Sequence, residues 1–103
     1  PTYGMDLARA VLTHVDQPTF FDFSCYHFAQ QGATTWFDFA QKIVGLTKSP
    51  CKISPCTTAA YPTAARRPLY AVLDTTRIEN HLSLRPLRWE VALEDCLKRI
   101  EAE

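Results

Sequence analysis

Apolar residues recur at helical spacing in three parts of the chain. Residues 6–15, 35–47 and 89–100 each carry one apolar stripe, so the pattern predicts three amphipathic helices. A fourth, shorter helix is expected near residues 75–82, because Asp74-Thr75-Thr76 is typical of a helix start. The stripes consist of Leu7, Ala8, Val11, Leu12 and Val15; of Trp36, Phe39, Ala40, Ile43 and Val44; and of Trp89, Leu93, Cys96, Leu97 and Ile100.

Other stretches favour strands. Residues 20–29 are rich in aromatic side chains and largely alternate, while residues 51–54 and 70–73 could each form a short strand. The expected order is helix, strand, helix, strand, loop, strand, helix, helix. We therefore predict a mixed α/β fold that is rich in helix, with about four helices and two or three short strands. Residues 1–103 are expected to form a single domain.

The helix predicted after residue 34 has a specific start. The Thr35 side chain can accept a hydrogen bond from the third backbone N–H inside the helix, and Asp38 complements the positive helix end. Trp36 follows the cap directly. Two interpretations of Trp36 stay open, namely a core residue at the base of the helix and a contact to a ligand.

Charge is distributed unevenly along the chain. Eleven Lys and Arg residues balance eleven Asp and Glu residues, yet no acidic residue lies between Asp38 and Asp74. A local positive excess attracts anionic ligands even when the whole molecule is neutral. The segment holds five basic residues, which are Lys42, Lys48, Lys52, Arg66 and Arg67.

The adjacent arginines lie in a loop over residues 57–68 that contains prolines and small residues. Pro68 biases the backbone of Arg67 toward an extended conformation and so restricts the direction of its guanidinium group. This combination is typical of a functional loop. The alternative is that Arg67 braces the loop by donating to backbone carbonyls.

Several classes of function lack their motifs. With only three glycines the chain has no Gly-rich phosphate loop, and no lysine follows any tyrosine by four residues, so the Tyr–Lys pair of hydride-transfer enzymes is absent. No nucleophile elbow, apolar membrane span or secretory signal is visible. We therefore predict no catalytic residue, no bound cofactor and no membrane contact for this chain alone.

Metal and nucleic-acid binding are not indicated either. The cysteines and histidines do not have the spacing of metal ligands, so we expect reduced cysteines that pack as small apolar groups. The sequence pI is about 7.3, and most aromatic residues belong to the apolar stripes rather than alternating with basic residues. We therefore predict no metal site and no nucleic-acid partner.

Four stretches in this order and spacing resemble a known family. They look like the carboxy-terminal third of dTDP-4-dehydrorhamnose reductase, a family of extended short-chain dehydrogenases that act on nucleotide sugars. The resemblance covers nearly the whole chain, and only residues 20–24 look unusual. Its most specific parts are Thr34-Thr35-Trp36 and the Arg66-Arg67-Pro68 loop. The stretches are PTYGMDLARAVL (1–12), YHFAQQGATTWFDFAQKI (26–43), YPTAARRPLYAVLDTTRIE (61–79) and LRPLRWEVALEDCL (84–97).

The resemblance implies a two-part cytoplasmic enzyme. An amino-terminal Rossmann domain, absent from this sequence, would bind NADPH or NADH and supply the Tyr–Lys pair. Residues 1–103 would form the smaller domain that closes as a lid over a dTDP-sugar. The enzyme would reduce dTDP-4-dehydro-L-rhamnose to dTDP-L-rhamnose, which feeds cell-surface polysaccharides. The lid alone would be inactive, and it could self-associate through surface that the Rossmann domain would cover.

The resemblance also assigns residues to substrate binding. Arg67 is expected to reach the pyrophosphate of the nucleotide sugar, with Arg66 as the second candidate, because a guanidinium group pairs two N–H donors with phosphate oxygens. Trp36 and Thr35 at the helix start are expected to contact the sugar nucleotide.

Two other interpretations remain open. The regulatory subunit of methionine adenosyltransferase is similar across the same region and is not primarily a reductase. A free-standing interaction module that never had a Rossmann partner belongs to a different class. The coding sequence upstream of Pro1 would distinguish these possibilities.

Overall fold

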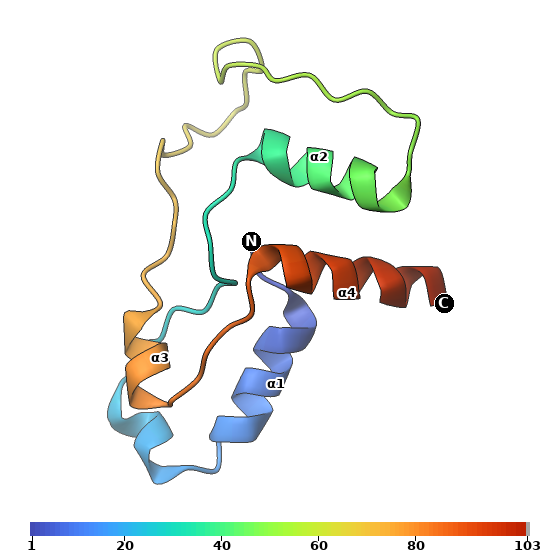
Figure 1. The fold of residues 1–103 in the computed structure, drawn as a ribbon. Coiled ribbons are helices and arrows are strands. Elements are labelled where there is room, and N and C mark those ends of the chain that lie inside the picture. The colour runs from blue at the N-terminus through green and yellow to red at the C-terminus, as the bar shows by residue number, and fades with distance from the viewer. Residues whose placement is uncertain (103) are drawn as a thin grey trace. The chain divides into compact units, whose positions relative to one another are not determined.

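A computed structural model of the protein describes residues 1–102 (Figure 1). The four predicted helices are confirmed, and a short 3-10 helix is added. The chain divides into two compact units. Thr34–Val72 forms the α2 unit, and the parts of the chain before and after it together form the main unit. The elements are α1 (Gly4–His14), η1 (Pro18–Asp22), α2 (Trp36–Thr47), α3 (Thr76–His81) and α4 (Trp89–Ala102).

The predicted strands are wrong. Residues 1–102 contain one isolated parallel bridge, between Gln31 and Arg88, and no strand. Pro18 stands at the first position of η1, where its fixed φ favours a helical turn, so the first part of the expected strand at 20–29 is helical. The rest of that stretch and residues 51–54 and 70–73 lie beside no segment that would complete a ladder. A strand needs such a partner for its hydrogen bonds.

The core of the main unit is small. Five of its buried apolar side chains come from α1, α3, α4 and the turn after α3, and they are Ala10, Ile78, Leu82, Trp89 and Ala92. Pro86, in the segment before α4, is buried as well. Three residues of the predicted α1 stripe, Leu7, Val11 and Leu12, are instead exposed. Burying a helix stripe requires a facing element, and α1 contributes only Ala10 to the buried core. The α1 stripe thus forms an exposed apolar surface.

Gln30 is the buried polar residue of the main unit, with 5% of its surface exposed. Its Nε2 donates to the carbonyl of Leu87 at 2.9 Å and to Oδ2 of Asp6 at 3.2 Å, and its Oε1 accepts from the N–H of Tyr3 at 3.3 Å. The Gln30 side chain therefore joins the start of α1 to the segment that leads into α4. A buried amide is stable there because its donors and acceptor are paired.

Gln31 continues this junction through its backbone. Its N–H donates to the carbonyl of Leu87 at 2.9 Å, and its carbonyl accepts from the N–H of Trp89 at 3.0 Å. Its side chain donates to Oε1 of Glu79 in α3 at 3.2 Å. The pair Gln30-Gln31 thus connects α1, α3 and α4.

The turn after this junction requires glycine. Gly32 has φ +91°, and a Cβ atom there would lie 3.1 Å from both Nη2 of Arg88 and Cδ1 of Trp89. Gly32→Ala should therefore lower the free energy of unfolding by about 1–3 kcal/mol. Gly45→Ala is the matched control. Gly45 lies inside α2, and an added methyl group would have no atom within 4 Å, so alanine should stabilise by about 0.5–1 kcal/mol. Urea unfolding followed by circular dichroism measures both, and equal effects at the two glycines would contradict the assignment.

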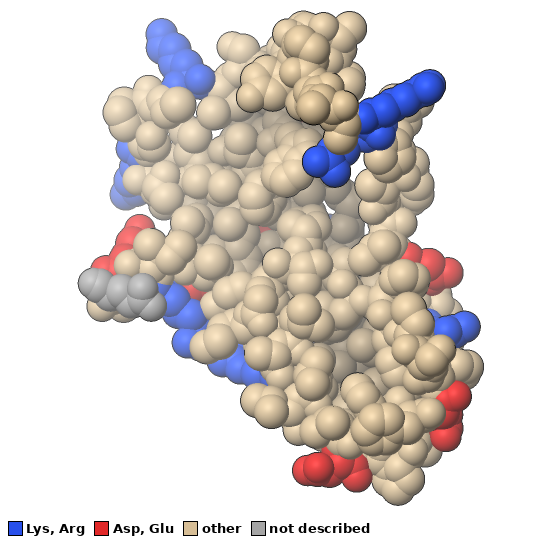
Figure 2. Space-filling view, turned by 180° about the vertical axis from the view of Figure 1, so that it is seen from behind, with Lys and Arg blue, Asp and Glu red and all other residues tan. Residues whose placement is uncertain are grey.

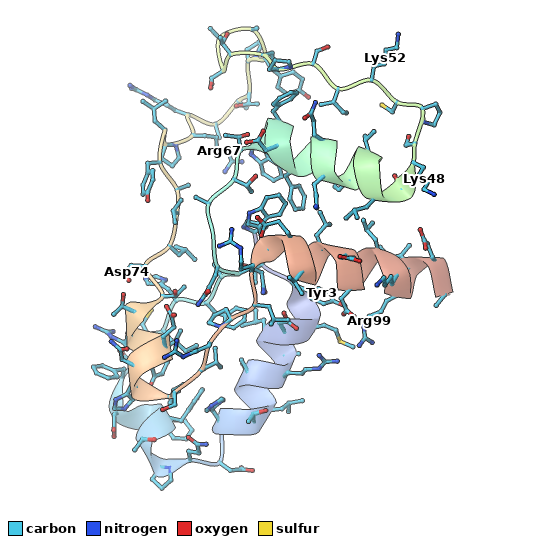
Figure 3. The ribbon with its side chains drawn as sticks, in the orientation of Figure 1. Tyr3, Lys48, Lys52, Arg67, Asp74 and Arg99 are labelled. Carbon is cyan, nitrogen blue, oxygen red and sulfur yellow. The ribbon has the colours of Figure 1, made fainter. Side chains whose placement is uncertain are left out.

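The start of α1 is also bonded to α4. The Tyr3 hydroxyl donates to Oδ2 of Asp95 at 3.0 Å, and Nε of Arg99 donates to the same oxygen at 3.0 Å (Figure 3). The bond from Arg99, followed by that from Tyr3, lowers the pKa of Asp95 below its ordinary 3.8. Desolvation, followed by the bond to Asp95, raises the pKa of Tyr3 above 10.0. Two i,i+4 ion pairs lie on the same helix, Glu94–Lys98 at 3.3 Å and Asp95–Arg99 at 3.0 Å.

The free energy of unfolding should differ between the protein and Tyr3→Phe by an amount that varies with pH. The two pKa shifts predict this variation, one at acid pH and the other at alkaline pH. The lowered pKa of Asp95 gives stability that is present above pH 3.8 and lost as pH falls through the folded-state pKa. The raised pKa of Tyr3 gives stability that is present below pH 10.0 and lost as pH rises through the folded-state pKa. Unfolding of both proteins across pH should show the largest difference between these limits. A difference that does not vary with pH would exclude the bond as its cause.

The structure gives a specific acceptor for the start of α3. Oδ1 of Asp74 accepts from the N–H of Thr76 at 3.0 Å, whereas the Thr75 side chain makes no capping bond. The Thr76 hydroxyl and then its N–H lower the pKa of Asp74. Asp74 is therefore a capping carboxylate.

No helix in the described part of the chain is both long and apolar enough to cross a membrane.

Candidate functional site

The predicted start of α2 is confirmed in detail. Thr35 has an extended backbone, and its Oγ1 accepts from the N–H of Asp38 at 3.1 Å. The helix ends at Thr47, after which Lys48 takes a left-handed conformation with φ 54° and donates its N–H to the carbonyl of Val44. Thr35 thus has a structural role as the N-cap. Because its hydroxyl oxygen acts there as an acceptor, its own hydrogen is free to donate to a ligand.

Trp36 does not lie in a core. Its side chain is 87% exposed, and its ring meets Phe39 edge to face with centroids 6.2 Å apart. The core interpretation of Trp36 is wrong for this structure, and the rest of the predicted α2 stripe is half-buried rather than buried. Helix α2 has twelve residues and none of them is buried, so this helix offers no core in which the indole ring could lie. The ring therefore stands beside the cap of α2 as an open aromatic surface.

The loop that follows α2 is held by local bonds. The N–H of Ala60 donates to the carbonyl of Thr57 at 3.1 Å, and the Thr63 hydroxyl donates to the carbonyl of Ala65 at 2.8 Å. Every residue from 54 to 74 is exposed, with Leu69 at 101%. A segment with few buried contacts opens at low free-energy cost. The loop can therefore change conformation when a ligand binds.

Arg66 and Arg67 are both exposed on this loop (Figure 3 shows Arg67). Neither guanidinium donates to a backbone carbonyl or pairs with a carboxylate among residues 1–102. The alternative in which Arg67 braces the loop therefore has no contact to support it here. Its role toward a ligand stays a prediction.

The lysines of the same unit are also unpaired within the described range. Lys42, Lys48 and Lys52 are exposed, and the ion pairs of the structure all belong to the main unit. Figure 2 shows Lys and Arg side chains that project from the α2 unit at separate points rather than as one patch. Charges at separate points attract anions to the surface without fixing their position. Tight binding of an anion such as phosphate needs the paired N–H donors of an arginine guanidinium group.

Two of the hollows among the described residues lie in the main unit, and neither contains a predicted site residue. One has a volume of about 210 Å³ and lies between α1 and residues 84–87, with Arg9, His14 and Arg85 on its walls. The other has a volume of about 200 Å³ and is lined by Cys25, His27, Asp74 and Arg77. Both are smaller than the roughly 300–1,000 Å³ typical of ligand pockets, so neither encloses a nucleotide sugar.

The second hollow groups residues that sequence reasoning did not assign to a site. The signal available in the sequence was the i,i+2 spacing of Cys25 and His27, which places both on one side of an extended chain. Among the described residues no group of three potential ligands is arranged to hold a metal ion. The expected packing is wrong for three of the four cysteines, while Cys96 is half-buried on α4. All four are free thiols, and Cys25, Cys51 and Cys56 are exposed because their segments contribute nothing to the core.

Comparison with known proteins identifies the family of this helical fold. The profile of the RmlD substrate binding domain matches residues 1–102. The chain belongs to the RmlD substrate-binding domain family. The predicted resemblance is thereby confirmed.

Relatives of this RmlD-type domain agree with the match. This chain is 29% identical over 104 residues to the dTDP-4-dehydrorhamnose reductase of Aggregatibacter actinomycetemcomitans. That match covers 92% of this chain and 35% of the relative. The chain is 34% identical over 98 residues to the spore coat polysaccharide biosynthesis protein SpsK of Bacillus subtilis (strain 168), covering 95% and 33%. A crystal structure of a dTDP-4-dehydrorhamnose reductase, an RfbD ortholog from Clostridium acetobutylicum, superposes with a TM-score of 0.88 at 33% identity, covering 98% of this chain and 35% of that one.

The RmlD-type domain therefore spans about a third of the length of these relatives. The superposition covers 98% of this chain, so it includes residues of both the main unit and the α2 unit. What the relatives do as whole proteins involves residues beyond those of this sequence.

Proposed function

We propose that the chain is the nucleotide-sugar-binding part of a dTDP-4-dehydrorhamnose reductase. In the intact enzyme an amino-terminal Rossmann domain binds NADPH or NADH and supplies the catalytic residues. The enzyme then reduces dTDP-4-dehydro-L-rhamnose to dTDP-L-rhamnose. The observation that carries this proposal is the match to the RmlD substrate-binding family over residues 1–102.

The residues of the α2 unit give this proposal its chemistry. Arg67, with Arg66 as the second candidate, donates N–H groups to the pyrophosphate oxygens of the dTDP-sugar. The support for this role is that both guanidinium groups are exposed and unpaired among the described residues. The open ring of Trp36 offers a flat apolar surface to the nucleotide, and the Thr35 hydroxyl offers a donor.

A nicotinamide cofactor, when bound to the other domain, would supply the hydride. The residues of this chain bind the sugar nucleotide, orient its keto group and exclude water when the domain closes. Binding energy from a remote group such as pyrophosphate can hold the substrate in the reacting geometry.

The proposal is tested with the intact chain, including the coding sequence upstream of Pro1. We expect the purified protein to oxidise NADPH when dTDP-4-dehydro-L-rhamnose is added, and to yield dTDP-L-rhamnose by mass spectrometry and NMR. The same keto sugar with the opposite configuration at carbon 5 is the control substrate. Absence of turnover with dTDP-4-dehydro-L-rhamnose, in a protein that binds NADPH, would reject the proposed reaction, whether or not the control sugar is reduced.

The 103-residue chain itself should neither bind nor oxidise NADPH, because it lacks a Gly-rich phosphate loop and a Tyr–Lys pair. Titration with NADPH while following nicotinamide fluorescence measures this. Saturable binding at micromolar concentration would show that the cofactor site does not lie wholly on another domain.

A further inference from the structure

The hollow between α1 and residues 84–87 combines an apolar lining with basic side chains, and we call it the α1 hollow. Ala10 and Pro86 line it as buried residues, while Arg9 and Arg85 are exposed. Each arginine directly precedes one of these buried residues in the sequence. Burial of Ala10 and Pro86 therefore fixes the backbone beside both arginines, which come from the two sides of the hollow. Its other apolar lining residues are Phe28, Leu84 and Leu87.

Arg85 is the basic side chain of the main unit that has no partner among residues 1–102. No hydrogen bond or ion pair reaches its guanidinium group, whereas every other Lys or Arg of that unit within this range makes such a contact. Pro86 biases the backbone of Arg85 toward an extended conformation and so restricts the direction of its side chain. A guanidinium group has five N–H donors and stays charged. Arg85 thus leaves these donors available at the α1 hollow.

Arg9 is only weakly engaged on the α1 side. Its Nη1 lies 3.9 Å from Oδ1 of Asp6, which is beyond hydrogen-bond distance. The other oxygen of Asp6, Oδ2, accepts from Nε2 of Gln30 at 3.2 Å, so this carboxylate is held by the junction at Gln30. Asp6 also lines the hollow, and its charge offsets part of the charge of the two arginines. Two guanidinium groups and one carboxylate leave a single positive charge, which matches a singly charged anion.

The last turn of α1 adds polar groups to the same hollow, through Thr13 and His14. The Thr13 hydroxyl makes no hydrogen bond within residues 1–102, whereas the hydroxyl of Thr47 at the end of α2 donates to the carbonyl of Ile43 at 2.8 Å. Nδ1 of His14 lies 2.9 Å from the carbonyl of Ala10, which can only accept, so we assign a hydrogen to Nδ1. The carboxyl end of a helix carries a partial negative charge, which further disfavours a doubly charged anion. The Thr13 hydroxyl therefore remains as an uncharged donor beside the arginines.

The size and lining of the α1 hollow limit the kind of ligand. Its volume of about 210 Å³ is roughly seven times the 30 Å³ that a water molecule occupies in the liquid. This space accommodates a small organic molecule. Apolar walls with a few convergent polar groups are typical of sites for such ligands, whereas a site for inorganic ions has no need of an apolar lining.

We propose that the α1 hollow binds a small organic carboxylate that has an apolar body. Arg85 and Arg9 donate N–H groups to the carboxylate oxygens, because a guanidinium fork matches the geometry of a carboxylate. The apolar body lies against the apolar lining, where its burial removes apolar surface from water. No residue of the hollow belongs to the α2 unit, so this proposal does not rest on the proposed function.

Benzoate serves as the probe, and benzamide is its uncharged counterpart. NMR titration of the isotope-labelled intact chain at constant ionic strength follows the backbone amides one by one. We expect benzoate to shift the amides of Arg9, Thr13 and Arg85 saturably. Benzamide should bind at least about tenfold more weakly, because it makes no charge-assisted hydrogen bond. Acetate keeps the carboxylate but lacks the ring, so it should also bind more weakly than benzoate.

Three variants locate the binding. Arg85→Gln should weaken benzoate binding at least about tenfold. Because Arg85 is exposed and its side chain contacts no polar partner among residues 1–102, this change should leave folding intact. Lys52→Gln removes another exposed cation, in the α2 unit, and is the matched control. Asp6→Asn keeps an acceptor for Gln30 but removes the opposing charge, so it should tighten binding.

Three results would overturn the proposal. Equal affinity for benzamide and benzoate would show that the carboxylate is not recognised. Equal weakening by Arg85→Gln and Lys52→Gln would reduce the effect to general electrostatic attraction. Tighter binding of inorganic phosphate than of benzoate at the same amides would make this a phosphate site. The titration is resolved by residue and needs no nicotinamide cofactor, so its outcome is independent of the reductase assay.

Discussion

Arg67→Ala in the intact reductase is expected to lower kcat/KM for the sugar nucleotide by about ten- to a hundredfold. Charge-assisted hydrogen bonds contribute roughly 1.5–3 kcal/mol each, and the substitution removes a guanidinium fork that no group within residues 1–102 engages. The pyrophosphate is remote from the keto carbon, so most of the loss should appear in KM. Steady-state kinetics with varied sugar nucleotide at saturating NADPH separates KM from kcat.

Two variants sharpen this test. Arg67→Lys should recover only part of the loss, because an ammonium group keeps the charge but lacks the planar fork. Lys52→Ala is the control for general electrostatic attraction, since Lys52 is another exposed, unpaired cation of the same unit within the described range. NADPH affinity should be unchanged in all three variants. A raised KM for Arg66→Ala with an unaltered KM for Arg67→Ala would assign the contact to Arg66, and no effect at either arginine would remove the loop from the site.

Gln30→Leu is expected to give the largest loss of stability, about 2–4 kcal/mol in the free energy of unfolding. The leucine has a similar size but removes the partners of the Tyr3 N–H, the Asp6 carboxylate and the Leu87 carbonyl. Leaving buried polar groups unpaired costs more than the net value of the bonds themselves. Urea unfolding at neutral pH measures the change.

Gln41→Leu provides the matched control, because Gln41 is exposed on α2 and should tolerate leucine within about 0.5 kcal/mol. Gln30→Glu is a second test. It keeps an acceptor for Tyr3 but loses both donors and places a carboxylate beside Asp6, so its loss of stability should diminish as pH falls and the carboxylates become protonated. Similar losses for Gln30→Leu and Gln41→Leu would show that the buried amide does not organise the main unit.

The local features of the fold could be read from the sequence. Each helix is specified by residues close together in the chain, through apolar spacing, the Thr35 cap and the i,i+4 ion pairs of α4, and these are present in the structure. The acid-free stretch that holds Arg66 and Arg67 was visible for the same reason. The resemblance to the reductase family rests on short motifs and is confirmed by the match over residues 1–102.

The features that depend on distant residues could not be read in this way. Alternation at residues 20–29 predicted a strand, but a strand forms only where another segment supplies its hydrogen bonds, and none of the described residues does so there. Spacing placed Trp36 on the apolar stripe of α2, yet no facing element covers its ring. Nothing in the local sequence marks Gln30 as buried, yet it is, because Asp6, Tyr3 and Leu87, up to 57 positions away, converge on its side chain. Helical periodicity and charge are properties of neighbouring residues, whereas burial and strand pairing depend on which distant segments meet.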